Sequence, residues 1–582
     1  MKQRRVWAPF ARTVEVSAGN HRFTMKADDD GWWETELDDN AAESDYAFRI
    51  DGSEPLPDPR SPWQPSGVFA PSRPIDHAKF HWSDDCWNQP PLGIIYECHV
   101  GTFTAEGTFD ATANKLEYLR DLGITHLELM PVAEFPGKHG WGYDGVDLYA
   151  PHHAYGGPDG LKRLVDRCHR IGLGVILDVV YNHLGPSGNF LQRFGPYLTD
   201  RYRTPWGNAI NLDGEYSHEV RRFLCDNALM WLRDYHIDGL RLDAVHAIFD
   251  SSAIHFLKQL ASEVRVLSAQ LRRHFVLTAE SELNNPRLVI PPEAGGYGLD
   301  AQWSDDFHHA IHGCLTGETS GYYADFGSLS QLAKALHNPY VYDGTFSKFR
   351  KRHHGRPARD LPANRFVVCT QNHDQVGNRA KGDRLVHLVS VAQLKIAAAL
   401  LMCSPFVPLI FQGEEWAASS PFLYFENHED SDLVAAIREG RRKEFAHFFK
   451  SVNDVPDPHA PQTFIASKLK WNERQSSGHA DIYGWYRDLI ALRRTNPDLS
   501  DPRLDNTDVN FDDERQWLTM RRGSTMLLCN FSDSRRRVFA AGIKHAQLLL
   551  ASNKAIDIGA AAAEVPPIAV AVVSLDRRRA PI

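Results

Sequence analysis

The 582-residue chain lacks the features that mark several classes of protein. Its apolar runs fall well short of the about 20 residues needed to cross a bilayer, so no membrane span is predicted. The first residues are basic, but no apolar stretch of about 7 to 15 residues follows them, so no secretion signal is expected. The net charge is −10 and no basic stripe is present, which argues against nucleic acid as the main partner. A cytoplasmic protein with a neutral ligand is predicted.

Cysteine is sparse, and no C-x-x-C pair occurs. The eight cysteines lie within apolar segments, which is typical of buried, reduced thiols in a cytoplasmic protein: Cys86, Cys98, Cys168, Cys225, Cys314, Cys369, Cys403 and Cys529. No G-x-G-x-x-G stands between a strand and a helix, so a dinucleotide-binding open sheet has no support. No cofactor is expected.

The residues that could ligate a metal are also poorly spaced for it. The 28 histidines include adjacent pairs such as His152 and His153, but these lack the i, i+4 helical spacing of a zinc site. The short segment 184–218 offers few carboxylates and no calcium-loop spacing: Asp200, Asp213 and Glu215. No metal is expected.

The order of patterns along the chain predicts an α/β protein with three parts. Residues 1–88 carry short alternating runs and a Pro-rich connector, which indicates a β-sandwich and a linker. From Ile94 eight apolar strand-like runs alternate with amphipathic helical segments, which favours a (β/α)8 TIM barrel over 89–498 with a short insert at 184–218. Strand character returns in 499–582, which predicts a C-terminal β-sandwich.

Three acidic residues stand at the downstream ends of three strand-like runs. Asp243 follows GLRL, Glu280 follows FVLTA and Asp374 follows FVVCTQNH. A barrel enzyme presents its catalytic groups where its parallel strands end, and glycoside hydrolysis uses a pair of carboxylates. The pattern therefore predicts a glycoside-cleaving site. His373 and Asp374 are sequential, so both can face it only where strand alternation has ended.

The strand around Asp243 also places a cation beside it. Since side chains alternate along a strand, Arg241 and Asp243 share one face, and the arginine would hold the carboxylate ionised and oriented. A buried ion pair without a catalytic role is the alternative. In GVILDVVYNH the same alternation turns Asp178 inward as a structural carboxylate, with His183 at the mouth of the strand.

Four segments in order, DVVYNH, GLRLDAVHAI, LTAES and QNHDQVGNR, resemble the signature regions of the α-amylase family of glycoside hydrolases. The resemblance covers the barrel and its flanking parts. It implies a retaining mechanism in which Asp243 is the nucleophile, Glu280 the general acid and base, and Asp374 the carboxylate that holds the distorted sugar ring. The substrate-binding residues that it implies are Tyr143, His183, Arg241, His246, His373 and Trp141.

Hydrolases, branching transferases and isomerases of this family share these residues, so the reaction needs further evidence. The segments YECHVGTFTAEGTFD, QWSDDFHHAIHGCLTGE and FQGEEWAASSPF resemble members that cut the α-1,4 bond next to the terminal trehalose of maltooligosyltrehalose. A glycogen-branching transferase is the alternative, and a non-catalytic glucan-binding relative is a minor one. The implied partners are α-1,4-glucan oligosaccharides capped with trehalose, and maltooligosyltrehalose synthase in the same pathway.

The stretch from Gly413 to Asp430, after the eighth strand-like run, is rich in aromatic and acidic residues. Because sugar faces pack on aromatic rings, these rings are candidates for the subsites of the trehalose end, and packing of most of them inside the loop is an alternative of at least equal weight: Trp416, Phe422, Tyr424 and Phe425.

Overall fold

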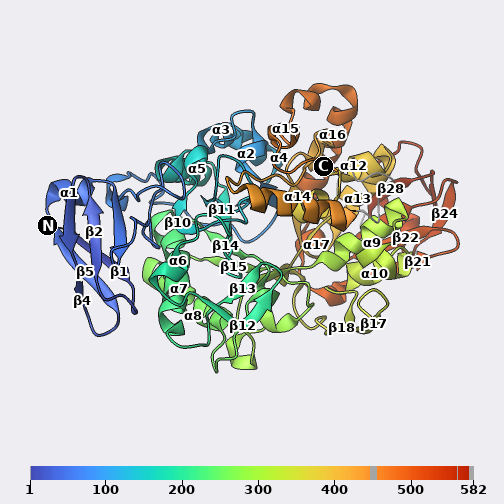
Figure 1. Cartoon of the computed structure of the whole chain (residues 1–582). Coiled ribbons are helices and arrows are strands. Elements are labelled where there is room, and N and C mark those ends of the chain that lie inside the picture. Colours follow the sequence, from blue (N-terminus) through green and yellow to red (C-terminus); the bar gives the residue numbers. More distant parts are fainter. Residues whose placement is uncertain (1, 446–454, 560–561, 576–582) are drawn as a thin grey trace.

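Eight parallel strands close into a barrel at the centre of the molecule (Figure 1). The computed structural model describes residues 2–445, 455–559 and 562–575. Each of the eight strand-like runs contains one barrel strand: β7 (Ile95–Cys98), β8 (His126–Leu129), β11 (Gly174–Val179), β14 (Gly239–Leu242), β15 (Val276–Ala279), β16 (Ala301–Trp303), β19 (Phe366–Cys369) and β20 (Val407–Phe411).

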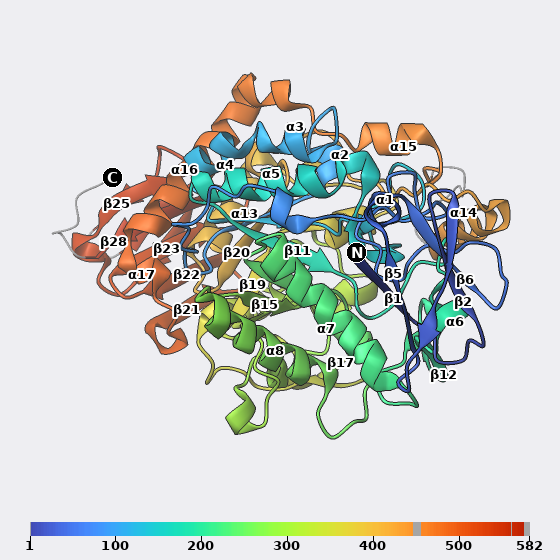
Figure 2. The same ribbon diagram turned by 90° about the vertical axis from the view of Figure 1, so that its left-hand side faces the viewer.

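The barrel closes in chain order, because β20 pairs with β7 through Leu409 and Ile95. All pairs are parallel, so the carboxyl ends of the strands share one end of the barrel. Helices return the chain between strands, and Figure 2 shows two of them, α7 and α8, along the outside of the barrel. The main helices are α4 (Leu116–Leu122), α5 (Gly157–Arg170), α7 (Ser217–Asp234), α8 (Phe256–Leu271), α9 (Asp305–Thr316), α10 (Leu329–His337), α13 (Val391–Cys403) and α16 (Ser477–Thr495).

Strand alternation divides β14 as its sequence predicts. Leu240 and Leu242 belong to the large apolar core that includes the outer helices, whereas Arg241 lies fully buried inside the barrel. Deeper in the barrel, the interior is filled by a small apolar cluster that includes Ile176 and Val407. Arg241 thus lies nearer than Ile176 of this cluster to the end of the barrel where the site is expected.

Antiparallel sheets flank the barrel at both ends of the chain, and Figure 1 shows them on opposite sides of it. This arrangement confirms the predicted fold class. The division at residues 88 and 498 stays a prediction. The N-terminal strands form two three-stranded sheets: β1 (Lys2–Trp7), β2 (Val14–Ala18), β3 (His21–Thr24), β4 (Lys26–Ala27), β5 (Trp32–Leu37) and β6 (Tyr46–Ile50). The C-terminal strands form a five-stranded and a three-stranded sheet: β21 (Thr507–Asp512), β22 (Trp517–Arg522), β23 (Thr525–Asn530), β24 (Arg536–Phe539), β25 (Gln547–Ala551), β26 (Asp557–Ile558), β27 (Ala562–Val565) and β28 (Ala569–Ser574).

The insert after β11 is a short antiparallel hairpin, β12 (Leu198–Thr204) paired with β13 (Gly207–Ile210). Among the described helices, none combines the length and the apolar character that a membrane crossing requires. All eight cysteines are unpaired, but Cys86 is exposed and Cys314 only partly buried, so the expectation that every thiol is buried is wrong for these two.

Candidate active site

The three predicted carboxylates lie at the same end of the barrel. Asp243 directly follows β14, and its backbone N–H donates to the carbonyl of Val179 at 3.0 Å. Glu280 directly follows β15, and its N–H donates to the carbonyl of Leu242, also at 3.0 Å. The backbone ladder therefore continues just past the strands and fixes the two acids side by side.

The Arg241 guanidinium joins these acids. Its Nη1 donates to Asp243 Oδ1 at 2.9 Å and to Asp178 Oδ2 at 2.6 Å, and its Nη2 lies 3.1 Å from Glu280 Oε2. The guanidinium lies over the ring of Trp303, 4.4 Å from its centroid. One fully buried cation thus orients both predicted catalytic carboxylates, so Asp243 and Arg241 are not an isolated ion pair.

Asp374 lies in the first turn of α11 (His373–Gly377), five residues beyond Cys369, the last residue of β19. Asn372 caps this helix, since its Oδ1 accepts from the backbone N–H of Gln375 at 2.9 Å. His373 and Asp374 both reach the site because strand alternation has ended, as the sequence requires. The Asp374 side chain is 37% exposed, against 10% for Asp243, so it is the more accessible of the two.

The environment of Asp374 acts on its ionisation in two directions. Its Oδ2 lies 3.6 Å from His373 Nε2, and its Oδ1 accepts from Asn378 Nδ2 at 3.1 Å. Desolvation and the charge of Glu280 raise the pKa of Asp374, whereas the charge of His373 lowers it, and the net shift is upward.

Tyr143 connects the histidine to the buried acids. Its hydroxyl donates to Asp178 Oδ2 at 2.7 Å and lies 2.7 Å from His373 Nε2, and its ring stacks on His373 with centroids 5.2 Å apart. Asp178 therefore acts as a hydrogen-bonding carboxylate, as its inward position predicts. Burial raises the pKa of Asp178 to about 7, against the opposing effect of the Arg241 charge.

Trp141 packs behind this cluster. Its ring stacks on Phe422 with centroids 5.1 Å apart, and its Nε1 donates to the carbonyl of Leu423 at 2.9 Å. The residue is 6% exposed, and it meets Tyr143 and His373 edge to face. This packing favours support of those two side chains over direct stacking on a sugar.

His183 lies at the mouth of its strand, as predicted, and it carries a partner that the sequence patterns did not single out. Its Nε2 lies 3.1 Å from the Tyr143 carbonyl, and its ring stacks on Trp206 at 4.4 Å and 9°. Trp206 is 49% exposed at the turn of the insert hairpin. The one sequence feature that could have pointed to Trp206 is its position as a lone aromatic residue in the turn sequence TPWG. His246 lies in the short helical turn Val245–Ala247 just past Asp243 and is partly exposed.

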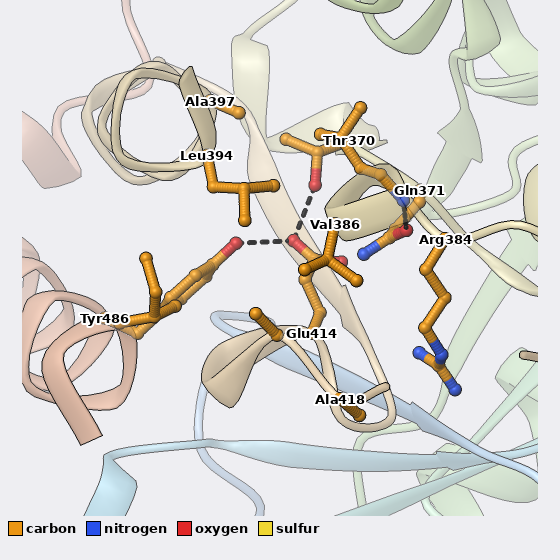
Figure 3. Close-up of a pocket in the computed structure, with 12 residues that line it drawn as sticks. Thr370, Gln371, Arg384, Val386, Leu394, Ala397, Glu414, Ala418 and Tyr486 are labelled. Carbon is orange, nitrogen blue, oxygen red and sulfur yellow. Dashed lines mark hydrogen bonds between the residues drawn. The ribbon is translucent and has the colours of Figure 1, made fainter. Parts of the chain in front are cut away.

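The segment after β20 differs from its expectation. Figure 3 shows Glu414 turned into the protein, where its Oε1 accepts from Thr370 Oγ1 at 2.5 Å and from Tyr486 Oη at 2.7 Å. Glu415 likewise accepts hydrogen bonds from Tyr96 and Tyr118. Both carboxylates are buried, so neither faces the barrel mouth as a ligand-reading group.

The aromatic rings of the same segment are mostly buried too. The alternative of packing inside the loop holds for three of them, because their side chains are 0% exposed and no sugar can reach them: Trp416, Phe422 and Phe425. Tyr424 is partly exposed and lies against Trp141 and the Arg441 guanidinium, so it stays a candidate.

Within the described ranges, one group of three possible metal ligands occurs, formed by Glu134, His152 and His153. Both oxygens of Glu134 already accept from His153, from its Nδ1 at 2.6 Å and from its backbone N–H at 2.7 Å. We interpret the group as a hydrogen-bonded turn. In the insert, Asp213 accepts from Tyr202 and Ser251 and is thus engaged as well. The absence of a metal stays a prediction.

Comparisons with known proteins agree with this geometry. The family model described as "Alpha amylase, catalytic domain" matches residues 67–204. Malto-oligosyltrehalose trehalohydrolase of Rhizobium sp. (strain M-11) is 47% identical over 579 residues, which are 98% of this chain and 97% of that protein. The chain belongs to the malto-oligosyltrehalose trehalohydrolases of the α-amylase family.

Two further comparisons, with a solved structure and with a branching enzyme, are consistent with this assignment. A crystal structure titled as a putative α-amylase from Salmonella typhimurium superposes with a TM-score of 0.90 at 37% identity, covering 98% of this chain and 97% of that one. A 1,4-alpha-glucan branching enzyme of Pseudoalteromonas atlantica is only 26% identical, over 93% of this chain and 73% of that protein.

Proposed function

We propose that this protein is a retaining glycoside hydrolase that cleaves the α-1,4 bond next to the terminal trehalose of maltooligosyltrehalose and releases trehalose. The main observation that supports this mechanism is the buried guanidinium of Arg241. One of its terminal nitrogens contacts Asp243 and the other contacts Glu280. This arrangement supports the short carboxyl separation of a retaining enzyme, about 5 Å, which leaves no room for an intervening water. The relatives' names support the substrate.

In the first step, a carboxylate oxygen of Asp243 attacks the anomeric carbon of the glucosyl unit before the cleaved bond. Glu280 gives its proton to the glycosidic oxygen, and trehalose leaves as the neutral alcohol. In the second step, Glu280 takes a proton from water, which attacks the same carbon and releases Asp243 as a carboxylate. The maltooligosaccharide leaves with its anomeric configuration retained.

The remaining residues are proposed to hold the glucosyl unit. Asp374, partly exposed beside His373, binds the ring hydroxyls, and Tyr143 supplies a ring face and a hydroxyl at the base of the site. His183 and His246 lie at the mouth, where their imidazole nitrogens can contact sugar hydroxyls. Arg241 acts by orienting the two catalytic carboxylates.

A branching transferase would use the same carboxylates, so the product decides between the two reactions. Maltotriosyltrehalose and maltopentaose are given separately to the wild-type enzyme, and kcat/KM and products are measured. We expect a ratio of at least about 100 in favour of the trehalose-capped substrate, which corresponds to about 2.7 kcal/mol. Free trehalose is the expected product. Equal rates would indicate an ordinary amylase, and new α-1,6 linkages on amylose would indicate a branching enzyme.

The cellular setting follows from this substrate. The protein is proposed to act in the cytoplasm, downstream of a maltooligosyltrehalose synthase that caps the glucan, and to need no cofactor. The unpaired state of all eight cysteines supports a reducing compartment.

A further inference from the structure

Glu97 lies on β7 inside the barrel, where it contacts His373 of the candidate active site. Both of its carboxylate oxygens meet the same residue, since Oε2 accepts from the His373 backbone N–H at 2.9 Å and Oε1 lies 2.5 Å from His373 Nδ1. The side chain is 1% exposed. This acid therefore fixes both the backbone and the ring of His373, although neither the strand-end pattern nor the signature segments include it.

The other ring nitrogen of His373 faces the Tyr143 hydroxyl, which accepts there when its own proton is donated to Asp178. Nε2 lies 2.7 Å from the Tyr143 hydroxyl, whose single proton is directed to Asp178 Oδ2 at 2.7 Å. Arg241 Nη1 also approaches this hydroxyl, at 3.4 Å, as a donor. Nδ1 faces a carboxylate, and Nε2 faces an oxygen whose proton goes to Asp178, so both ring nitrogens are placed to donate. That pattern favours a doubly protonated imidazolium.

We propose that Glu97 is a positioning residue that keeps His373 an imidazolium, so that the histidine holds Tyr143 at the base of the site and keeps a positive charge beside Asp374. The proposal deepens the proposed function, because the groups held in this way are those assigned to the glucosyl unit. Glu97 itself does not touch the substrate. It acts on the reaction through His373.

The charges that face His373 support this state. Burial alone would lower the pKa of His373, but the charges of Glu97 and Asp374, with the Glu97 hydrogen bond, raise it to about 10, against the Arg241 charge. The other neighbours are the edge of Trp141, the ring of Trp303 and the Tyr143 hydroxyl. With a raised pKa the cation persists through neutral pH. Without Glu97 the pKa would fall toward or below its ordinary value of about 6.5.

The neighbouring strand offers a matched control. Glu128 on β8 pairs in register with Glu97 and is equally buried. Burial and the Glu97 charge raise the pKa of Glu128 well above its ordinary value, which favours the neutral carboxyl. Its Oε2 has no hydrogen-bond partner in the described part of the chain. Glu128→Gln is thus the same change at a carboxyl that does not contact His373, whereas Glu97→Gln removes the carboxylate that faces His373 Nδ1.

The test compares the pH dependence of kcat for Glu97→Gln, Glu128→Gln and wild type between pH 5 and 9, on maltotriosyltrehalose. In Glu97→Gln, His373 should lose its proton as pH rises through neutrality. For each protein, kcat at pH 8.5 is divided by kcat at pH 5.5. This ratio should be at least about tenfold lower in Glu97→Gln than in wild type. Glu128→Gln should keep the wild-type profile. If kcat of Glu97→Gln changed with pH as in wild type, whatever its absolute value, the proposal would be overturned.

A second measurement needs neither a folded Glu97→Gln variant nor a substrate. In wild-type protein labelled with ¹⁵N-histidine, the His373 resonances are assigned by their loss in His373→Asn, and their shifts at pH 8 report the protonation of both nitrogens. Imidazolium shifts are expected, and shifts of a neutral ring would refute the proposal. Failure of the proposed function would appear separately, as wild-type enzyme that releases no trehalose.

Discussion

Two regions that follow barrel strands carry acids and aromatic rings, but one forms the candidate active site and the other supports the fold. In the mouth formed after β14, β15 and β19, the acids are tied to the cations Arg241 and His373 and keep partly exposed oxygens. In the segment after β20, the acids accept from tyrosine and threonine hydroxyls and are sealed inside the protein. The same residue types thus form a reactive site in one region and a structural support in the other.

The difference lies in the partners of the carboxylates. A cation holds a carboxylate in a fixed orientation at the mouth, as Arg241 does for the proposed nucleophile Asp243. A hydroxyl donor in a buried setting stabilises the packing of a loop without making its acid available to a ligand. Burial raises the pKa of Glu414, and it raises the pKa of Glu415 to about 7, which fits acids kept away from solvent.

The largest expected contrast between the two regions is in turnover. Asp243→Asn and Glu280→Gln should each lower kcat by at least about three orders of magnitude, because each removes a reacting group. The melting temperature should stay near that of wild type. Glu414→Gln, an equally conservative change after β20, should keep kcat within about threefold and lower the free energy of unfolding by about 1–3 kcal/mol. Equal losses of activity in all three variants would remove the distinction.

The next contrast is in stability. Trp416→Ala should lower the free energy of unfolding by about 3–5 kcal/mol, because a fully buried ring leaves a cavity. In the fraction that remains folded, the preference for maltotriosyltrehalose over maltopentaose should be unchanged. Chemical denaturation and steady-state kinetics measure the two quantities. A lost preference without lost stability would restore Trp416 as a subsite residue.

A smaller effect, on KM, is expected for Trp206 in the turn of the insert hairpin. Trp206→Ala should raise KM about tenfold with kcat changed less than about threefold, because its exposed ring can cover a sugar face and bury apolar area worth about 1.4 kcal/mol. Phe539, equally exposed on β24 of the C-terminal sheets, is the control, and Phe539→Ala should leave KM unchanged. Identical KM values for both variants would exclude Trp206 from substrate binding.

No effect is expected from metal removal. Dialysis against a chelator should leave activity and melting temperature unchanged, since the insert carries only three acids and one of them, Asp213, accepts hydrogen bonds from Tyr202 and Ser251. A melting temperature that drops by several degrees and recovers with calcium would show a metal site.

The sequence predicts the barrel and the mouth well for a physical reason. Strand alternation is local, so the inward direction of Arg241 and the strand-end position of Asp243 follow from neighbouring residues. Burial of Trp416 and Glu414 depends on long-range packing against Trp471 and Tyr486, which no local pattern reveals. Glu97 was missed for the same reason, since its contact with His373 joins segments distant in the chain. Trp206 stands out locally as an aromatic in a turn, but its stacking on His183 is visible only in the folded chain.

The most direct test of the account is to identify the residue that bonds to the sugar. An activated fluoroglycoside that slows hydrolysis of the glycosyl-enzyme is incubated with the wild-type protein, and the labelled peptide is sequenced by mass spectrometry. One glycosyl group per chain is expected, attached to Asp243 in the segment GLRLDAV. A label on any other residue, or a product released first in the inverted configuration, would contradict it.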